Sequence, residues 1–161
     1  MKTKQRITVV LLVLGLSAIM AIPSALACTT RTPGYWKNHY SEWVIPTNWG
    51  GPNGFWISGG LITKQQALEI LNMAPRGDAR IILEQKIIAA VLSIGGDPDG
   101  AGGYSMGEYF PGTPTMAQLV HDGSMWLETH PGALGPGAAG RDQALTYASM
   151  IDYWLNYYDA D

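Results

Sequence analysis

The sequence predicts an all-α protein, a small bundle of four to five helices around one buried helix, after an aromatic, loop-rich N-terminal segment. The main observation is the stretch Asp78–Ile94, whose second half is apolar on nearly every side, as in a helix enclosed by its neighbours. Two later stretches, 116–127 and 142–158, repeat apolar residues at helical spacing. Glycine- and proline-rich segments separate these stretches and predict loops.

Start and stop signals place the two helices at the centre of the chain. Thr63 and Gln66 have the spacing of a capping box and predict a helix through Leu71, which Pro75 ends. Asp78 can cap the next helix, and Gly95–Gly96 predicts its end in the left-handed conformation. Because the connection is short, we expect the two helices to form an antiparallel hairpin.

The C-terminal half predicts two further helices. Thr113–Pro114 begins the first, in which Gly123 can introduce a bend. The second begins at about Asp142, and Tyr153, Trp154 and Tyr157 lie beside or opposite its buried stripe. The residues expected to pack inward are Met116, Leu119, Val120, Trp126 and Leu127 in the first helix, and Ala144, Leu145, Ala148, Ile151, Leu155 and Tyr158 in the second.

The stretch 95–113 holds seven glycines and predicts a turn-rich linker. Asp97 to Glu108 has the length of a calcium-binding loop, but its fifth position is Ala101, which has no oxygen ligand to offer. We therefore interpret it as a linker and not as a calcium site.

The N-terminus has the pattern of an export signal. Lys2, Lys4 and Arg6 precede the apolar run 7–22, and Ala25-Leu26-Ala27 fits a signal-peptidase site. The alternative is a retained anchor, for which the run falls short of the ~20 residues that span a bilayer. The sequence predicts a signal peptide over 1–27 cleaved after Ala27, a secreted or cell-surface location, and one helical domain over 28–161, with an aromatic lid (28–62) and a helical core (63–161).

Charge and cysteine content limit the partners of this domain. Without residues 1–27, seven Lys and Arg stand against thirteen Asp and Glu, a formal charge of −6 with no basic cluster, which argues against nucleic acid or anionic membrane as partner. Cys28 would be the first mature residue and is the single cysteine of the chain. We interpret it as a free or modified terminal thiol without a further role, with a lipid anchor or an intermolecular cross-link that makes a homo-oligomer as alternatives.

Aromatic residues are concentrated at the start of the mature chain. Between Tyr35 and Trp56 lie seven of the sixteen aromatic residues and four of the six tryptophans. Such side chains either form core or bind sugar rings and proteins. The candidate binding residues are Tyr35, Trp36, His39, Trp43, Trp49 and Trp56.

Local signals divide these candidates. Thr32–Pro33 predicts a short helix that places Trp36, Tyr40 and Trp43 on one side, where a core role is favoured. Trp49 and Trp56 belong to a Pro/Gly/Asn-rich loop, in which residues 55–57 can form a short hairpin arm. For these two tryptophans a binding surface is favoured.

The segment TPGYWKNH resembles the opening signature of a domain of unknown function in exported and cell-surface proteins of bacteria and archaea. It comprises Thr32, Pro33, Gly34, Tyr35, Trp36, Lys37, Asn38 and His39. The stretch 77–92, GDARIILEQKIIAAVL, is similar to the second landmark of that family, and 116–127 and 144–152 are similar more loosely. The resemblance implies an extracellular, mostly helical module without an established activity.

Two positions depart from the family pattern. Tyr40 stands where a proline commonly follows the histidine. Many members also carry a second cysteine, and this chain does not, so a structural disulfide within the chain is not expected.

The sequence contains no recognisable catalytic motif, and we expect no cofactor and no metal. Cys28, His39, His121 and His130 are the available zinc ligands, but none are paired at metal-binding spacing. The predicted function is a non-enzymatic secreted or cell-surface interaction module whose partner is a protein or glycan of the surface or matrix. A carbohydrate-binding module using the Tyr35–Trp56 aromatics is the alternative, and a metal-dependent hydrolase comes third.

The state of Cys28 can be measured directly. The intact mass of the exported protein, with and without reductant, should equal that of residues 28–161. A lipid adduct, or a doubled mass that halves on reduction, would show instead that Cys28 is an anchor or a cross-link. A mass that includes residues 1–27 would contradict the predicted cleavage.

Overall fold

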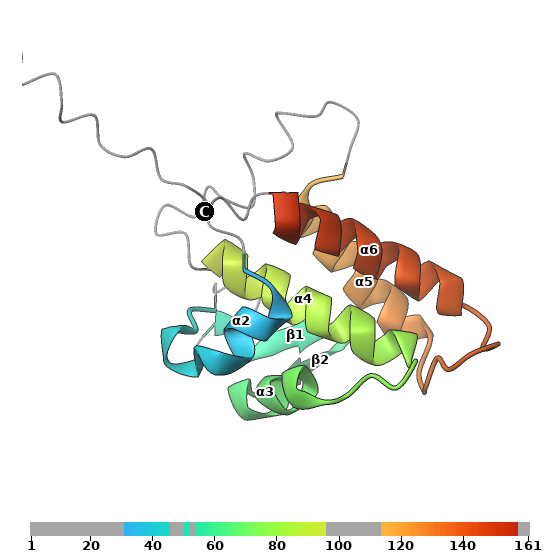
Figure 1. Ribbon diagram of the computed structural model, residues 1–161, viewed down its shortest axis with the longest axis horizontal. Helices are drawn as coiled ribbons and strands as arrows, with labels where there is room; N and C mark the ends of the chain where they lie inside the picture. The colour runs from blue at the N-terminus through green and yellow to red at the C-terminus, as the bar shows by residue number, and fades with distance from the viewer. Residues whose placement is uncertain (1–30, 46–49, 52–53, 96–113, 158–161) are drawn as a thin grey trace, which may run out of the picture.

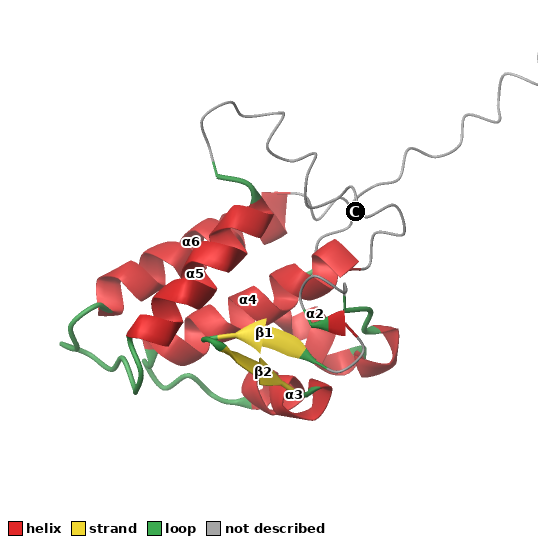
Figure 2. Cartoon of the chain, turned by 180° about the vertical axis from the view of Figure 1, so that it is seen from behind, coloured by secondary structure: helices red, strands yellow, loops and turns green. Residues whose placement is uncertain are grey.

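The computed structural model describes residues 31–45, 50–51, 54–95 and 114–157, and it is mostly helical, as predicted (Figure 1). The first elements are α2 (Pro33–Asn38), η1 (Tyr40–Glu42) and the strands β1 (Phe55–Ile57) and β2 (Gly60–Ile62). The helices α3 (Lys64–Asn72), α4 (Ala79–Gly95), α5 (Met116–Thr129) and α6 (Arg141–Tyr157) follow. The strands form one antiparallel hairpin, seen beside α3 in Figure 2.

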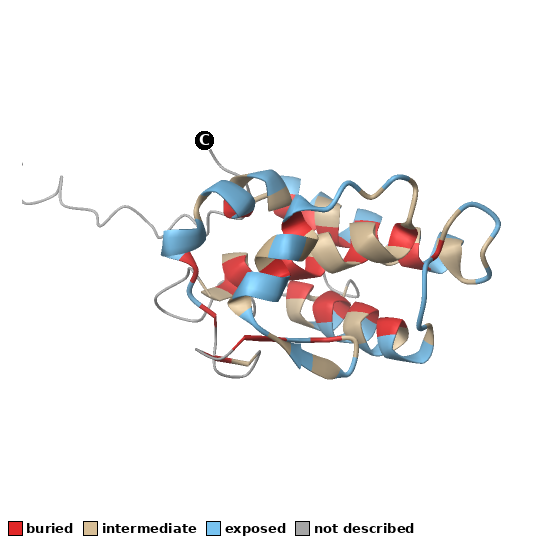
Figure 3. Ribbon diagram, turned by 90° about the horizontal axis from the view of Figure 1, so that it is seen from below, coloured by how far each residue is buried: buried red, intermediate tan, exposed pale blue. Residues whose placement is uncertain are grey.

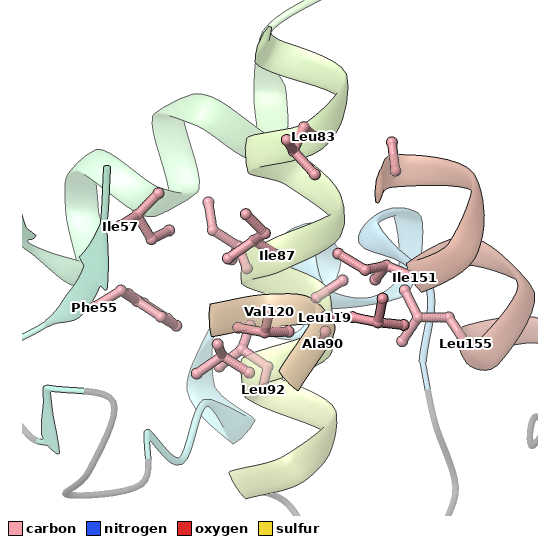
Figure 4. Packing of buried hydrophobic residues seen from close by; sticks show 14 of the residues in the cluster. Phe55, Ile57, Leu83, Ile87, Ala90, Leu92, Leu119, Val120, Ile151 and Leu155 are labelled. Carbon is pink, nitrogen blue, oxygen red and sulfur yellow. The ribbon is translucent and has the colours of Figure 1, made fainter. Parts of the chain in front are cut away.

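Helix α4 contacts α2, α3, α5, α6 and β1. From Ile87 to Leu92 all of its side chains are buried, because neighbours cover every side. Figure 4 shows Leu83 and Ile87 among side chains from the hairpin, α5 and α6. At the start of α4, the Asp78 carboxylate accepts from the amide of Arg80 at 2.9 Å, which confirms the expected cap.

The polar side chains of α4 are bonded to neighbouring elements. Arg80 donates to the carbonyls of Leu127 and His130 at the end of α5, at 3.2 and 2.9 Å. Gln85 donates to two carbonyls at the end of α3, both at 2.8 Å. Lys86 pairs with Asp152 of α6. The bonds of Arg80 and Gln85 end on carbonyls at the ends of α5 and α3, and together with the Lys86–Asp152 pair they position α3, α5 and α6 on α4.

Both capping boxes of the structure follow the same chemistry. Thr63 accepts from the amide of Gln66, whose side chain bonds back to the Thr63 amide, as predicted. Thr115 and Gln118 repeat the arrangement at α5, so this helix begins after Thr115 and not after Thr113. Proline at 114 precedes the cap instead of occupying the first helical position.

In α6, Ala144, Ala148, Ile151 and Leu155 are buried, as expected for the inward stripe. Trp154 is buried as well, which corrects its placement beside or opposite that stripe, whereas Tyr153 is exposed. Position 154 faces inward because it lies three residues after Ile151, on the same side of the helix. Tyr158 and the side chain of Tyr157 lie outside the described residues.

Gly77 and Asp78, which open the second landmark, link the loop between α3 and α4 to the loop before α6. Gly77 has φ +84°, a left-handed conformation that suits glycine. Besides capping α4, Asp78 accepts from the amide of Leu134 at 2.8 Å, and the carbonyl of Leu134 accepts from Ala79 and from Arg141. The loop before α6 is therefore fixed to the start of α4.

Several expectations concern residues outside the described ranges, among them the signal peptide, Cys28, Trp49, Gly96 and the stretch 97–108. Within the described ranges, no helix has both the length and the hydropathy of a membrane span.

Gly123 lies inside α5 and is buried against α4, where it permits close packing. A Cβ at this position would lie 3.5 Å from the nearest atoms of Leu83 and Ile87, an ordinary van der Waals distance. We therefore expect Gly123→Ala to raise the free energy of unfolding by up to about 1 kcal/mol, because alanine favours the helix.

Chemical denaturation measures this change, and Gly140→Ala is its control. Gly140 has φ +84°, and its Cβ would approach the Trp126 ring to 2.9 Å, so this substitution should destabilise. A destabilised Gly123→Ala would show that α4 and α5 cannot accommodate one methyl group.

Candidate binding surface

The aromatic lid consists of two short helical turns and not of one helix. α2 ends at Asn38 and η1 follows, so Trp36, Tyr40 and Trp43 do not share one helical face, and Tyr40 is exposed. Thr32 is the N-cap residue of α2, but its hydroxyl makes no capping hydrogen bond, contrary to expectation. Pro33 still occupies the first turn, where its fixed φ is compatible with a helix.

Trp36 and Trp43 belong to the core, with exposed fractions of 5% and 4%. The Trp36 indole donates to the Ser93 hydroxyl of α4 at 3.3 Å. The Trp43 indole donates to the Trp36 carbonyl at 2.9 Å, and its ring meets Phe55 edge-on at a centroid distance of 5.7 Å. Because both side chains are enclosed and satisfied, neither is accessible to a sugar or a protein.

Tyr35 and His39 are stacked on each other, with ring centroids 3.8 Å apart. His39 is the C-cap residue of α2, and its Nδ1 lies 2.7 Å from the Tyr35 carbonyl. A carbonyl only accepts, so Nδ1 carries the hydrogen of this bond. The Arg31 guanidinium carbon also lies over the Tyr35 ring, 5.0 Å from its centroid. These contacts leave Tyr35 poorly suited to stack on a ligand.

The Tyr35 hydroxyl is likewise bonded within the lid. It donates to the Glu42 carboxylate at 2.8 Å. This hydrogen bond raises the pKa of Tyr35 above its ordinary value of 10.0, because it favours the protonated phenol. The phenol therefore joins α2 to η1.

The hairpin separates an inner face from an outer face. Phe55 and Ile57 are buried, and Figure 4 shows both directed toward Ile87 of α4 and Val120 of α5. Since successive side chains in a strand alternate, Trp56 points outward and is 53% exposed. Figure 3 shows buried and exposed residues along the ribbon of the molecule. Leu61 is its Cα partner on β2 and is 47% exposed. Trp56 and Leu61 form what we call the hairpin surface.

Leu61 was not among the residues predicted to bind. Its position follows from a two-residue turn at Ser58–Gly59, where φ is +55° and +73°, as in the type I′ turns of tight hairpins. Counting outward from this turn pairs Trp56 with Leu61. The serine–glycine pair is a weaker turn signal than asparagine–glycine, so the register could not be read from the sequence.

The other candidate residues do not assemble into a site. Trp49 and Cys28 lie outside the described residues. His121 is exposed beside Asp122, and His130 stacks on Trp126 with ring centroids 3.9 Å apart. Across the described residues, no group of three or more His, Cys, Asp or Glu side chains is arranged to hold a metal ion.

Comparisons with protein families, with curated proteins and with solved structures give no match to this chain. The family resemblance of Thr32–His39 therefore stays a prediction, and the function must be argued from the hairpin surface itself.

The two environments of tryptophan predict opposite effects of truncation. Trp36→Ala should lower the free energy of unfolding by about 3–5 kcal/mol, because it leaves a cavity and removes the bond to Ser93. Trp56→Ala should cost less than about 1 kcal/mol, the scale of a cross-strand pair.

Denaturant unfolding of both variants measures the difference. Equal costs would contradict the assignment of Trp36 to the core and Trp56 to the surface. Trp43→Phe gives an intermediate comparison, because it keeps one aromatic ring in the core but loses the indole bond to Trp36 and part of the buried ring volume.

Proposed function

We propose that this protein is an exported, non-enzymatic module that binds a cell-surface or matrix component through the hairpin surface. One observation carries the proposal: a tryptophan that is half exposed on a strand whose other side chains are locked into the core. Because the buried neighbours fix the strand backbone, binding has to order only the side-chain torsions of Trp56, and tryptophan is enriched at the energetic centres of interfaces.

The sequence supports the proposed location of the protein outside the cell. The signal-peptide pattern of residues 1–27 supports export, and Cys28 offers a point of attachment or cross-linking to a second copy. The resemblance of Thr32–His39 to cell-surface domains agrees with this location.

Carbohydrate is the alternative ligand, and the structure changes which residues could bind it. Trp36 and Trp43 are buried, and the Tyr35 ring is covered by His39 and Arg31. Of the described candidates, Trp56 is the most exposed residue, and an exposed aromatic ring can stack on a sugar. A carbohydrate version of the proposal therefore depends on Trp56.

The proposal is tested with the purified mature protein and washed envelope fragments of the source organism. Trp56→Ala and Leu61→Ser should each weaken binding, and the tryptophan change should do so by about tenfold or more, as expected for a central anchor. Binding that is unchanged in both variants would refute the hairpin surface as the contact.

Tyr153→Ala is the matched control, because Tyr153 is an aromatic residue of similar exposure on α6. Soluble polysaccharides then separate the two ligand classes. Quenching of tryptophan fluorescence that Trp56→Ala abolishes would support carbohydrate, and envelope binding without any such quenching would support a protein partner.

A further inference from the structure

Strand β2 is the outer strand of the hairpin. β1 packs on α4 and α5 as well as on β2, whereas β2 packs extensively on β1 alone among the described elements. Figure 2 shows β1 lying between β2 and α4. The edge of β2 that faces away from β1 is therefore an open edge of the two-stranded sheet.

The register of the hairpin determines which main-chain groups reach this open edge. Ile57 and Gly60 flank the two-residue turn, and residues in that position exchange two hydrogen bonds across an antiparallel hairpin. Hydrogen-bonded and non-hydrogen-bonded pairs alternate along such a ladder, so Trp56 and Leu61 form a non-hydrogen-bonded pair. The N–H and C=O of Leu61 consequently point away from β1. Within residues 31–45, 50–51, 54–95 and 114–157, no backbone group outside the hairpin bonds to either of them.

An unpaired N–H beside an unpaired C=O on a strand edge is complementary to another extended chain. Natural sheet edges are commonly protected from such pairing by lysine, proline or a bulge. β2 consists of Gly60, Leu61 and Ile62, and so contains neither a charged residue nor a proline. Because the strand is short, it offers the two main-chain groups of one residue, and side chains must supply the remaining contact. The exposed side chains of the hairpin surface lie beside these groups.

We propose that the partner of the hairpin surface is an extended polypeptide segment that pairs with β2 as a third strand. The segment would exchange two hydrogen bonds with Leu61, as in other complexes formed by strand addition. Its residue opposite Leu61 would project to the same side of the sheet as Leu61 and Trp56, so an apolar residue there would extend the hairpin surface. This inference rests on the proposed function, because it names the class of partner that the same surface binds.

Hydrogen exchange of the free protein, followed by NMR, tests whether the edge is open. The Leu61 amide should exchange close to its intrinsic rate, because it points to solvent. The amides of Gly60 and Ile62 should exchange more slowly, because both residues belong to hydrogen-bonded pairs with β1. A Leu61 amide that is as slow as these two in the free protein would overturn the inference.

Two substitutions at one position test whether the partner uses the main chain. Leu61→Ala removes most of the side chain and keeps the N–H, whereas Leu61→Pro removes the N–H as well. Proline is tolerated on an edge strand where its nitrogen faces outward. Leu61→Pro should bind envelope fragments about twofold to tenfold more weakly than Leu61→Ala, the range expected for one hydrogen bond. Equal binding by the two variants would contradict strand addition.

Slow exchange at Gly60 and Ile62 in Leu61→Pro shows that the hairpin is intact. If the proline loosens the hairpin, the wild-type protein decides. Its Leu61 amide is then exchanged while the protein is bound to envelope fragments and is measured by NMR after release. Exchange should slow by about tenfold or more on binding, because the amide becomes hydrogen-bonded. An unchanged rate would overturn the inference.

Envelope fragments treated with protease separate this inference from the proposed function. Treatment should abolish binding, because the partner is a polypeptide. If protease-treated fragments still bind the wild-type protein and Trp56→Ala does not bind them, the proposed function stands with a carbohydrate ligand and strand addition fails. If Trp56→Ala and Leu61→Ser both bind untreated fragments normally, the hairpin surface is not the contact, and the proposed function fails together with this inference.

Discussion

The burial of α4 is the constraint on which the rest of this structure depends. From Ile87 to Leu92 the helix has no side that tolerates water, so other elements must cover it on every side. Apolar contact is non-directional and does not by itself decide where each neighbour stops or how it is rotated. Four polar residues of α4 supply that information, and each is bonded to a different neighbour: Arg80 to the end of α5, Gln85 to the end of α3, Lys86 to α6 and Ser93 to the segment before α2.

Those features of the fold that depend on neighbouring residues in the chain were predictable. The apolar run of α4, the Asp78 cap and the Thr63–Gln66 capping box are local patterns, and the structure contains all three. The roles of the aromatic residues were harder to predict, because spacing shows which side chains share a face but not what covers that face. For this reason the prediction placed Trp154 outside the buried stripe, although it is buried. For the same reason it grouped Tyr40, which is exposed, with Trp36 and Trp43. A three-residue strand is also too short to show the alternation of inward and outward residues in the sequence.

The two sequence landmarks have a structural explanation in this chain. Trp36 bonds to Ser93, His39 closes α2 on Tyr35, and Asp78 joins α4 to the loop before α6. Each of these side chains makes a hydrogen bond to another part of the domain. Both stretches therefore contribute to the stability of the fold. The hairpin surface lies outside both landmarks.

The bond between the Arg31 amide and Ser93 limits how the domain can be mounted on a support. At this point the chain is fixed to the last turns of α4, at 3.0 Å. Only three peptide units separate Arg31 from Cys28, a span of at most about 10 Å. A domain attached through Cys28 would be joined to its support by a very short linker. It would stand close to its support with one end turned toward it, and its orientation would be restricted as strongly as its position.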